Sequence, residues 1–219
     1  MYKRQGISYA FENDDFYVPA ARDMWDSSGL ERWHGVRQSI NDPFDPLKGP
    51  LITYLADGSV KECPQRVDFV KRCDFEQSFE QGCGGYGYNM AYIGSRLWQS
   101  DIGFEESYRK TARSTEVSAP AHTLMFADCA MSLDDGGYIE YSFAEPPFAV
   151  YNGTVMTDLY MSASIHFRHA QSANVGWVDG HVNLRDIAPL DEENVYGVTS
   201  GDMDLGWFEP LDNSLFDLE

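Results

Sequence analysis

The sequence has few cations and no long apolar run. Its 16 Lys plus Arg stand against 35 Asp plus Glu, which gives a formal net charge of −19. Such a charge repels phosphate backbones and anionic headgroups, so we expect no nucleic-acid partner. No stretch of the printed chain reaches about 18 consecutive apolar residues, the length of a membrane-spanning helix. The printed chain also shows no charged-then-apolar signal peptide.

The common catalytic motifs are missing as well. The sequence has no Gly-x-Ser-x-Gly elbow, no His-Glu-x-x-His and no Gly-rich phosphate loop. The glycines around Cys83 resemble a reactive-cysteine loop, but no specific partner base stands out, so a hinge or a disulfide loop is the preferred interpretation. We therefore predict a protein that is not an enzyme.

Cysteine is scarce, and its spacing matches neither zinc knuckles nor redox motifs. The four cysteines are Cys63, Cys73, Cys83 and Cys129, and the first three are ten residues apart. An even number is compatible with disulfides in an oxidising compartment, but free or buried thiols explain the pattern equally well. The sequence leaves both interpretations open.

The residues that are present suit a packed, β-rich chain. Hydrophobic residues make up 43% and aromatic residues 14%, which is enough for a core. Ile7, Ala10 and Phe11 share one face at i, i+3 and i+4 spacing, so residues 5–11 predict a helix. No capping residue precedes this helix, which favours a chain that starts inside a longer one.

Beyond the helix, the pattern predicts long loops followed by strands. Residues 20–50 are rich in Asp, Pro and Gly, and a short helix is expected within 46–55. Strands are predicted at 86–92, 123–127, 136–143 and 161–168. The expected class is α+β, with a helix stub at 1–18 and an antiparallel β-sheet head at 19–219.

The segment 173–185 predicts a β-hairpin. Asp179-Gly180 is a strong signal for a two-residue type I′ turn, which needs positive φ at both positions. In that register Trp177 pairs with Val182, and Val175 pairs with Leu184. These four apolar residues then share one face of the hairpin, and the polar residues occupy the other face together with one exception, Val178.

The same segment carries a family resemblance. His169, nine residues and then Asp179-Gly180 match the H-x9-D-G signature of bacterial pilin-like proteins, and His181 continues that family's Asp-Gly-His-Val block. Four shorter stretches also match in order along the chain: residues 9–19 (the helix exit), Cys63-Pro64, Tyr86-Gly-Tyr-Asn89 and Phe126-Ala-Asp128. The chain therefore resembles pseudopilins with the prepilin-type H-x9-D-G domain (DUF1559-like).

The resemblance implies a function and a location. It implies a structural pseudopilin-like head of a type II secretion or type IV pilus-related apparatus. The hairpin region, 161–186, lies in this head, which is displayed on the periplasmic, extracytoplasmic face of the cell envelope. Its partners would be other pilin-like subunits or secretion-apparatus proteins. The resemblance implies a prepilin leader and an apolar helix, of which the helix anchors the protein in the inner membrane. The printed chain departs from the family by lacking both.

Two further hypotheses concern bound ligands. No cofactor is required, but His169, Asp179 and Asp128 form a possible set for Ca²⁺ or another divalent ion. On paired strands Asp179 lies about 17 Å from His169, at about 3.3 Å per residue, so a structural role for both is the preferred interpretation. A hydrolase built on His169, His181 and Asp179 is the least favoured reading.

A binding module is the alternative function. Exposed aromatic residues in loops suit carbohydrate or another envelope polymer. The candidates are Trp25, Trp33 and Trp98.

Overall fold

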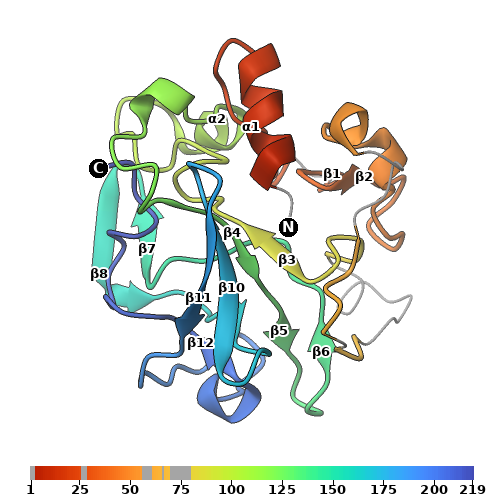
Figure 1. The fold of residues 1–219 in the computed structure, drawn as a ribbon, viewed down its shortest axis with the longest axis vertical. Helices are drawn as coiled ribbons and strands as arrows, with labels where there is room; N and C mark the ends of the chain where they lie inside the picture. Colours follow the sequence, from red (N-terminus) through yellow and green to blue (C-terminus); the bar gives the residue numbers. More distant parts are fainter. Residues whose placement is uncertain (1–2, 26–28, 56–60, 66, 70–79) are drawn as a thin grey trace.

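The structure is a computed structural model that describes residues 3–25, 29–55, 61–65, 67–69 and 80–219. Its elements are a short N-terminal helix, a second short helix and antiparallel strand pairs, which agrees with the α+β class (Figure 1). The helices and strands are α1 (Lys3–Glu12), β1 (Glu31–Arg32), β2 (Gly35–Val36), η1 (Pro46–Lys48), η2 (Ile52–Tyr54), β3 (Tyr86–Tyr88), α2 (Phe104–Arg109), η3 (Ser114–Glu116), β4 (Leu124–Asp128), β5 (Met131–Ser132), β6 (Tyr138–Ile139), β7 (Phe148–Tyr151), β8 (Thr154–Tyr160), β9 (Ile165–His166), β10 (Ser172–Trp177), β11 (Val182–Asp186), η4 (Gly201–Met203) and β12 (Leu205–Gly206).

The largest sheet has four antiparallel strands in the order β11-β10-β4-β3. All five residues of β4 are buried, as expected for a strand with neighbours on both edges and both faces. The alternation of aromatic and small residues in β3 also has a packing reason. A Cβ on Gly87 would lie 2.6 Å from the backbone carbon of Phe143, so only glycine permits this close approach.

Helix α1 lies at the upper end of this sheet in Figure 1. Its small residues Gly6 and Ala10 are buried, and a Cβ on Gly6 would lie 3.3 Å from the Sδ atom of Met125 in β4. Asp14 and Asp15 adopt left-handed conformations just after the helix, with φ of 52° and 66°, and so end it. The predicted helix 5–11 is confirmed within α1. No helix among the described residues combines the length and apolarity that crossing a bilayer requires.

The predicted hairpin is present, but its register is shifted by one residue. Gly176 pairs with Val182, and Val175 pairs with Asn183. Of the two turn residues only Gly180 has a positive φ, at 92°, so the turn is not type I′. The amide of Gly180 donates to the Trp177 carbonyl, and the amide of Trp177 donates to the His181 carbonyl. This geometry is a three-residue loop that closes on a left-handed glycine.

The one-residue shift changes which side chains are buried. A slip of one position moves a strand's side chains to the opposite face. Val175 and Trp177 are buried, whereas Val182 and Leu184 are 42% and 57% exposed. The prediction that these four residues share one apolar face was therefore wrong.

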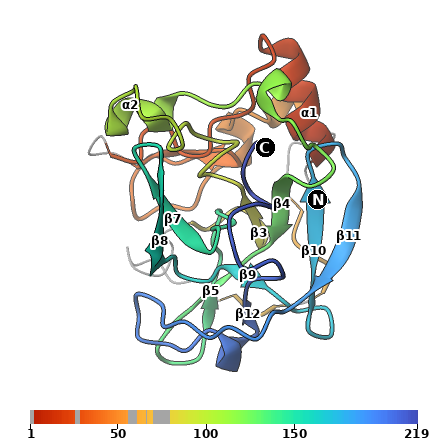
Figure 2. The same cartoon turned by 90° about the vertical axis from the view of Figure 1, so that its left-hand side faces the viewer.

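Several other expectations need correction. The predicted strand 161–168 contains only β9, which pairs with β12 (Figure 2). The short helix expected within 46–55 is two separate 3-10 helices, η1 and η2. The hairpin formed by β7 and β8 was not predicted, although its turn is an Asn-Gly pair with φ of 47° at Asn152 and 77° at Gly153. This is the I′ pattern that was expected at Asp179-Gly180.

Candidate functional site

The two halves of the H-x9-D-G signature lie in separate interactions. His169 Nε2 is 3.1 Å from Asp128 Oδ2, and the Asp128 side chain is only 1% exposed. Asp179 Oδ1 instead contacts His181 Nδ1 at 2.7 Å, at the partly exposed tip of the hairpin. Of the predicted metal-binding residues, the structure brings His169 and Asp128 together, and Asp179 belongs to the other pair.

A third ligand-type side chain joins His169 and Asp128. The Cys63 Sγ atom lies 3.6 Å from His169 Nε2. One sulfur, one nitrogen and one carboxylate oxygen from these residues all lie within 4.8 Å of one another. Among the described residues, no other three such side chains bring their ligand atoms this close. We call this group the Cys63–Asp128–His169 cluster.

The backbone fixes each member of the cluster. Asp128 is the last residue of β4. Its Oδ2 accepts hydrogen bonds from the backbone amide and the side-chain amide of Asn174, at 2.8 and 3.0 Å. Cys63 is held in place by a hydrogen bond from its amide to the Gly84 carbonyl. Three segments that are distant in the sequence therefore meet at one point.

His169 is positioned by a tight turn. Its amide donates to the Ser172 carbonyl, and the Ser172 amide donates back to the His169 carbonyl. The two residues between them, Ala170 and Gln171, have φ of 54° and 64°. Residues other than glycine adopt this left-handed conformation at a cost of about 1 kcal/mol or more each. The fold therefore holds His169 in place through a strained turn.

The Asp128 carboxylate has unused hydrogen-bonding capacity. Its Oδ1 is buried and has no hydrogen-bond partner among the described residues. The neighbouring Arg168 directs its Nη2 to the carbonyls of Gly85 and Cys129, at 3.0 and 2.7 Å. A buried carboxylate oxygen without a donor is costly unless a cation or water meets it.

The cysteines differ in their surroundings. Cys63, Cys83 and Cys129 are free thiols, and Cys73 lies outside the described residues. Burial raises the pKa of Cys83 and Cys129 far above that of an ordinary thiol, so both act as small apolar core residues. Cys63 is only half-buried, which makes it the accessible thiol of the three.

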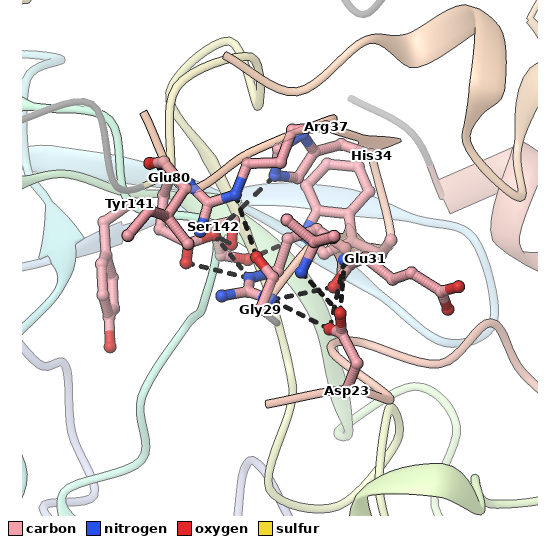
Figure 3. Close-up of polar contacts among 12 residues, drawn as sticks. Asp23, Gly29, Glu31, His34, Arg37, Glu80, Tyr141 and Ser142 are labelled. Carbon is pink, nitrogen blue, oxygen red and sulfur yellow. Dashed lines mark hydrogen bonds and ion pairs between the residues drawn. The ribbon is translucent and has the colours of Figure 1, made fainter. Parts of the chain in front are cut away.

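A second polar cluster joins Asp23, Arg32 and Glu80 (Figure 3), and their side chains are at most 10% exposed. Glu80 accepts from Arg32 Nε at 2.9 and 3.0 Å and from the Ser142 hydroxyl at 2.5 Å. Asp23 lies 3.6 Å from Arg32 Nη1 and caps the amides of residues 30 and 31. We call this group the Arg32–Glu80 cluster.

Burial and charge set the ionisation of this second cluster. Burial alone would raise the pKa of Glu80, but Arg32, His34 and Ser142 outweigh it and lower that pKa. Burial lowers the pKa of His34, which favours the neutral imidazole. A carboxylate between a guanidinium and a hydroxyl suits a role in holding loops together. Sequence reasoning missed this cluster because its members come from distant segments, and Arg32 and Glu80 are 48 positions apart.

The three candidate tryptophans have different environments. Trp33 is 0% exposed, and its Nε1 donates to the Ser142 carbonyl at 2.8 Å, so it is not available to an external ligand. Trp98 is half-buried and donates to the Tyr92 carbonyl. Trp25 is 56% exposed.

Comparison with known proteins adds no relative. No family model, curated protein or solved structure matches this chain.

Proposed function

We propose that this chain is the structural head of a pilin-like subunit in an envelope apparatus of the type II secretion or type IV pilus kind. The proposal rests on the ordered motifs, on a short helix followed by antiparallel sheets, and on the packing of α1. In this proposal the protein has no enzymatic role, and its partners are further copies or related subunits on the extracytoplasmic side of the inner membrane.

The observation that carries the proposal is the orientation of α1. An ordinary surface helix buries its large apolar residues and exposes its polar ones. In α1 the small residues Gly6 and Ala10 are buried against the sheet. The large apolar residues Ile7 and Phe11, one turn apart, are 37% and 85% exposed.

We call Ile7 and Phe11 the exposed stripe of α1, and we infer that it contacts another protein. A Cβ on Gly180 would lie 3.4 Å from Ile7 Cδ1, so the stripe adjoins the tip of the signature hairpin. Contiguous exposed apolar surface marks interaction sites, and we infer that Ile7 and Phe11 form part of one. A second pilin-like subunit, packed along α1, supplies the apolar surface that the stripe lacks.

The first test concerns the coding sequence upstream of residue 1. The proposal requires a prepilin leader and an apolar segment of about 20 residues in frame with α1. An in-frame stop codon with its own ribosome-binding site directly before residue 1 would overturn it.

The second test concerns assembly of the full-length protein. Phe11→Glu places a charge in the subunit contact, so we expect copurification of two differently tagged copies to fall at least tenfold, or about 1.4 kcal/mol. Leu47→Glu is the matched control, because Leu47 is an exposed apolar residue in η1, at 63%. Equal copurification of Phe11→Glu and the wild type would contradict the proposed contact.

One observation favours the alternative of a polymer-binding module. Trp25, Phe104 and Tyr151 form a row of neighbouring rings, with centroids 5.4 and 5.1 Å apart, and Trp25 and Tyr151 are both more than half exposed. Rows of exposed rings suit sugar faces. Under this alternative, Trp25→Ala weakens binding to envelope polysaccharide in a pull-down assay at least tenfold, and unchanged binding would count against it.

A further inference from the structure

The Cys63–Asp128–His169 cluster has the separations of a metal site. In a tetrahedral zinc site with bonds of about 2.3 Å to sulfur and about 2.0–2.1 Å to nitrogen and oxygen, the ligand atoms lie about 3.6 Å (S to N) and about 3.3 Å (N to O) apart. The corresponding distances here are 3.6 Å from Cys63 Sγ to His169 Nε2 and 3.1 Å from His169 Nε2 to Asp128 Oδ2. Two of the three separations therefore match a zinc site, and the third, from Cys63 Sγ to the Asp128 carboxylate, is no more than 4.8 Å.

The contacts also argue against a catalytic relay. In a Cys-His-Asp relay the thiol and the carboxylate contact different ring nitrogens, so that a proton taken at one nitrogen is stabilised at the other. Here Cys63 and Asp128 both contact Nε2 of His169. One nitrogen cannot serve both partners of a relay, whereas convergence of three donors on one point is the geometry of chelation.

We propose that Cys63, Asp128 and His169 bind one divalent transition metal ion, with zinc as the best fit to this mixed set of donors. Sulfur and imidazole ligands select zinc-like ions, whereas calcium and magnesium take oxygen ligands. The site goes beyond the proposed structural function and does not depend on it. Asp179, which the sequence suggested as a ligand, takes no part.

Two features of the site favour binding of an ion: its ligands are held in position, and one buried carboxylate oxygen lacks a donor in the described part of the chain. The Asn174 amides fix Asp128 Oδ2, and the strained turn after His169 fixes the backbone that carries the imidazole. The outer hydrogen bonds of a metal site orient its ligands in this way. The buried Asp128 Oδ1, which has no hydrogen-bond partner among the described residues, gives the carboxylate a reason to hold a cation.

The surroundings provide access and a place for a fourth ligand. A surface pocket lined by Cys63, Phe69 and Arg168 adjoins the cluster. The His169 side chain is 22% exposed, so the ion can enter from solvent. Three protein ligands and one open position are the arrangement of zinc sites that retain an exchangeable water. The ion would cross-link the Cys63 loop, the end of β4 and the turn before β10.

The test is a titration of the reduced full chain with Co²⁺, followed by absorption spectroscopy. We expect one Co²⁺ per chain, a thiolate charge-transfer band in the near ultraviolet, and displacement by Zn²⁺. Cys63→Ser should abolish the charge-transfer band, and His169→Gln should weaken binding at least tenfold. Asp128→Asn is the isosteric third variant, and circular dichroism verifies that each variant is folded.

His181→Gln is the matched control, because it removes the other His–Asp pair and leaves the cluster intact. Its titration should equal that of the wild type. The proposal is overturned if the wild type binds Co²⁺ no more tightly than Cys63→Ser and His169→Gln, or if the thiolate band persists in folded Cys63→Ser. A loss of binding in His181→Gln that equals the loss in His169→Gln would also overturn it, by placing the ion at the hairpin tip.

Discussion

The Arg32–Glu80 cluster and the Cys63–Asp128–His169 cluster contain similar groups but in opposite states. Both place a carboxylate that is almost fully buried beside basic or imidazole side chains. The Glu80 carboxylate receives a guanidinium and a hydroxyl, so its charge is balanced within the protein. The Asp128 carboxylate keeps one buried oxygen without a hydrogen-bond partner in the described chain and faces a partly exposed imidazole.

The difference separates a structural role from a binding role. A buried charge with its partners in place stabilises the arrangement of the loops around it and offers nothing to a ligand. A buried carboxylate with one oxygen that no donor among the described residues meets, next to accessible sulfur and nitrogen atoms, gains most when an ion binds. Stability should therefore depend on the first cluster, and metal affinity on the second.

The largest expected effect comes from breaking the Arg32–Glu80 cluster. Glu80→Gln removes the nearer of the two carboxylates that balance Arg32, whose side chain is 1% exposed, so the free energy of unfolding should fall by about 3–5 kcal/mol. Urea denaturation measures this loss. Glu31→Gln breaks the exposed pair with Arg22 instead and should cost less than about 1 kcal/mol. Equal losses in the two variants would contradict the structural role of Glu80.

A smaller expected effect is the pH dependence of stability that Glu145, a buried carboxyl influenced by Glu80, produces. Burial raises the pKa of Glu145 from 4.5 to about 7, and Glu80 adds to the rise, although the Tyr141 hydroxyl opposes it with a 2.7 Å hydrogen bond. Because the folded pKa is the higher one, the stability that protonated Glu145 contributes is complete below pH 4.5 and is lost as pH rises through about 7.

The variant Glu145→Gln isolates this contribution. Between pH 4 and pH 8 its free energy of unfolding should rise relative to wild type by about 3 kcal/mol, at about 1.4 kcal/mol per pKa unit. Burial, with Arg168 and His169, lowers the pKa of His166 to about 3, so its effect on stability has the opposite pH dependence. Because variant and wild type both contain His166, this effect cancels in the difference between their free energies of unfolding. A pH-independent difference between variant and wild type would show that Glu145 titrates as an exposed carboxyl does.

The smallest expected effect is on metal affinity at the Cys63–Asp128–His169 cluster. Asn174→Ala removes the side-chain donor to Asp128 Oδ2 but keeps the backbone donor and the three ligands, so Co²⁺ affinity should fall about tenfold. The same variant should lose much less stability than Glu80→Gln, because Asn174 is only half-buried. Urea denaturation and the cobalt titration measure the two quantities, and a loss of stability without a loss of affinity would contradict the account.

Local patterns in the sequence predicted elements better than they predicted geometry. The spacing of apolar residues identified α1, and the buried run before Asp128 identified β4. Asp179-Gly180 correctly marked a turn, but Asp-Gly suits both a two-residue and a three-residue loop. The register therefore depended on Asp179 keeping a negative φ, which the sequence does not encode directly.

The features that could not be predicted from the sequence depend on contacts between residues that are distant in the chain. His169 and Asp128 were candidate ligands, but Cys63 lies 106 residues from His169 and matches no known ligand spacing. Trp33 occurs in a polar, Pro-rich loop and was expected at the surface. It is buried because its rings pack 5.0 Å from Phe126 and its indole donates to the distant Ser142 carbonyl. Asn152-Gly153 was a readable turn signal that identifies the β7–β8 hairpin.

The most direct test of the comparison is zinc K-edge X-ray absorption on the full chain loaded with one equivalent of Zn²⁺. We expect one sulfur ligand at about 2.3 Å together with nitrogen and oxygen ligands at about 2.0–2.1 Å, including an imidazole. We also expect that the sulfur ligand disappears in Cys63→Ser and remains in His181→Gln. A wild-type spectrum with no sulfur ligand would contradict the claim that the Cys63–Asp128–His169 cluster, and not the Arg32–Glu80 cluster, binds the metal ion.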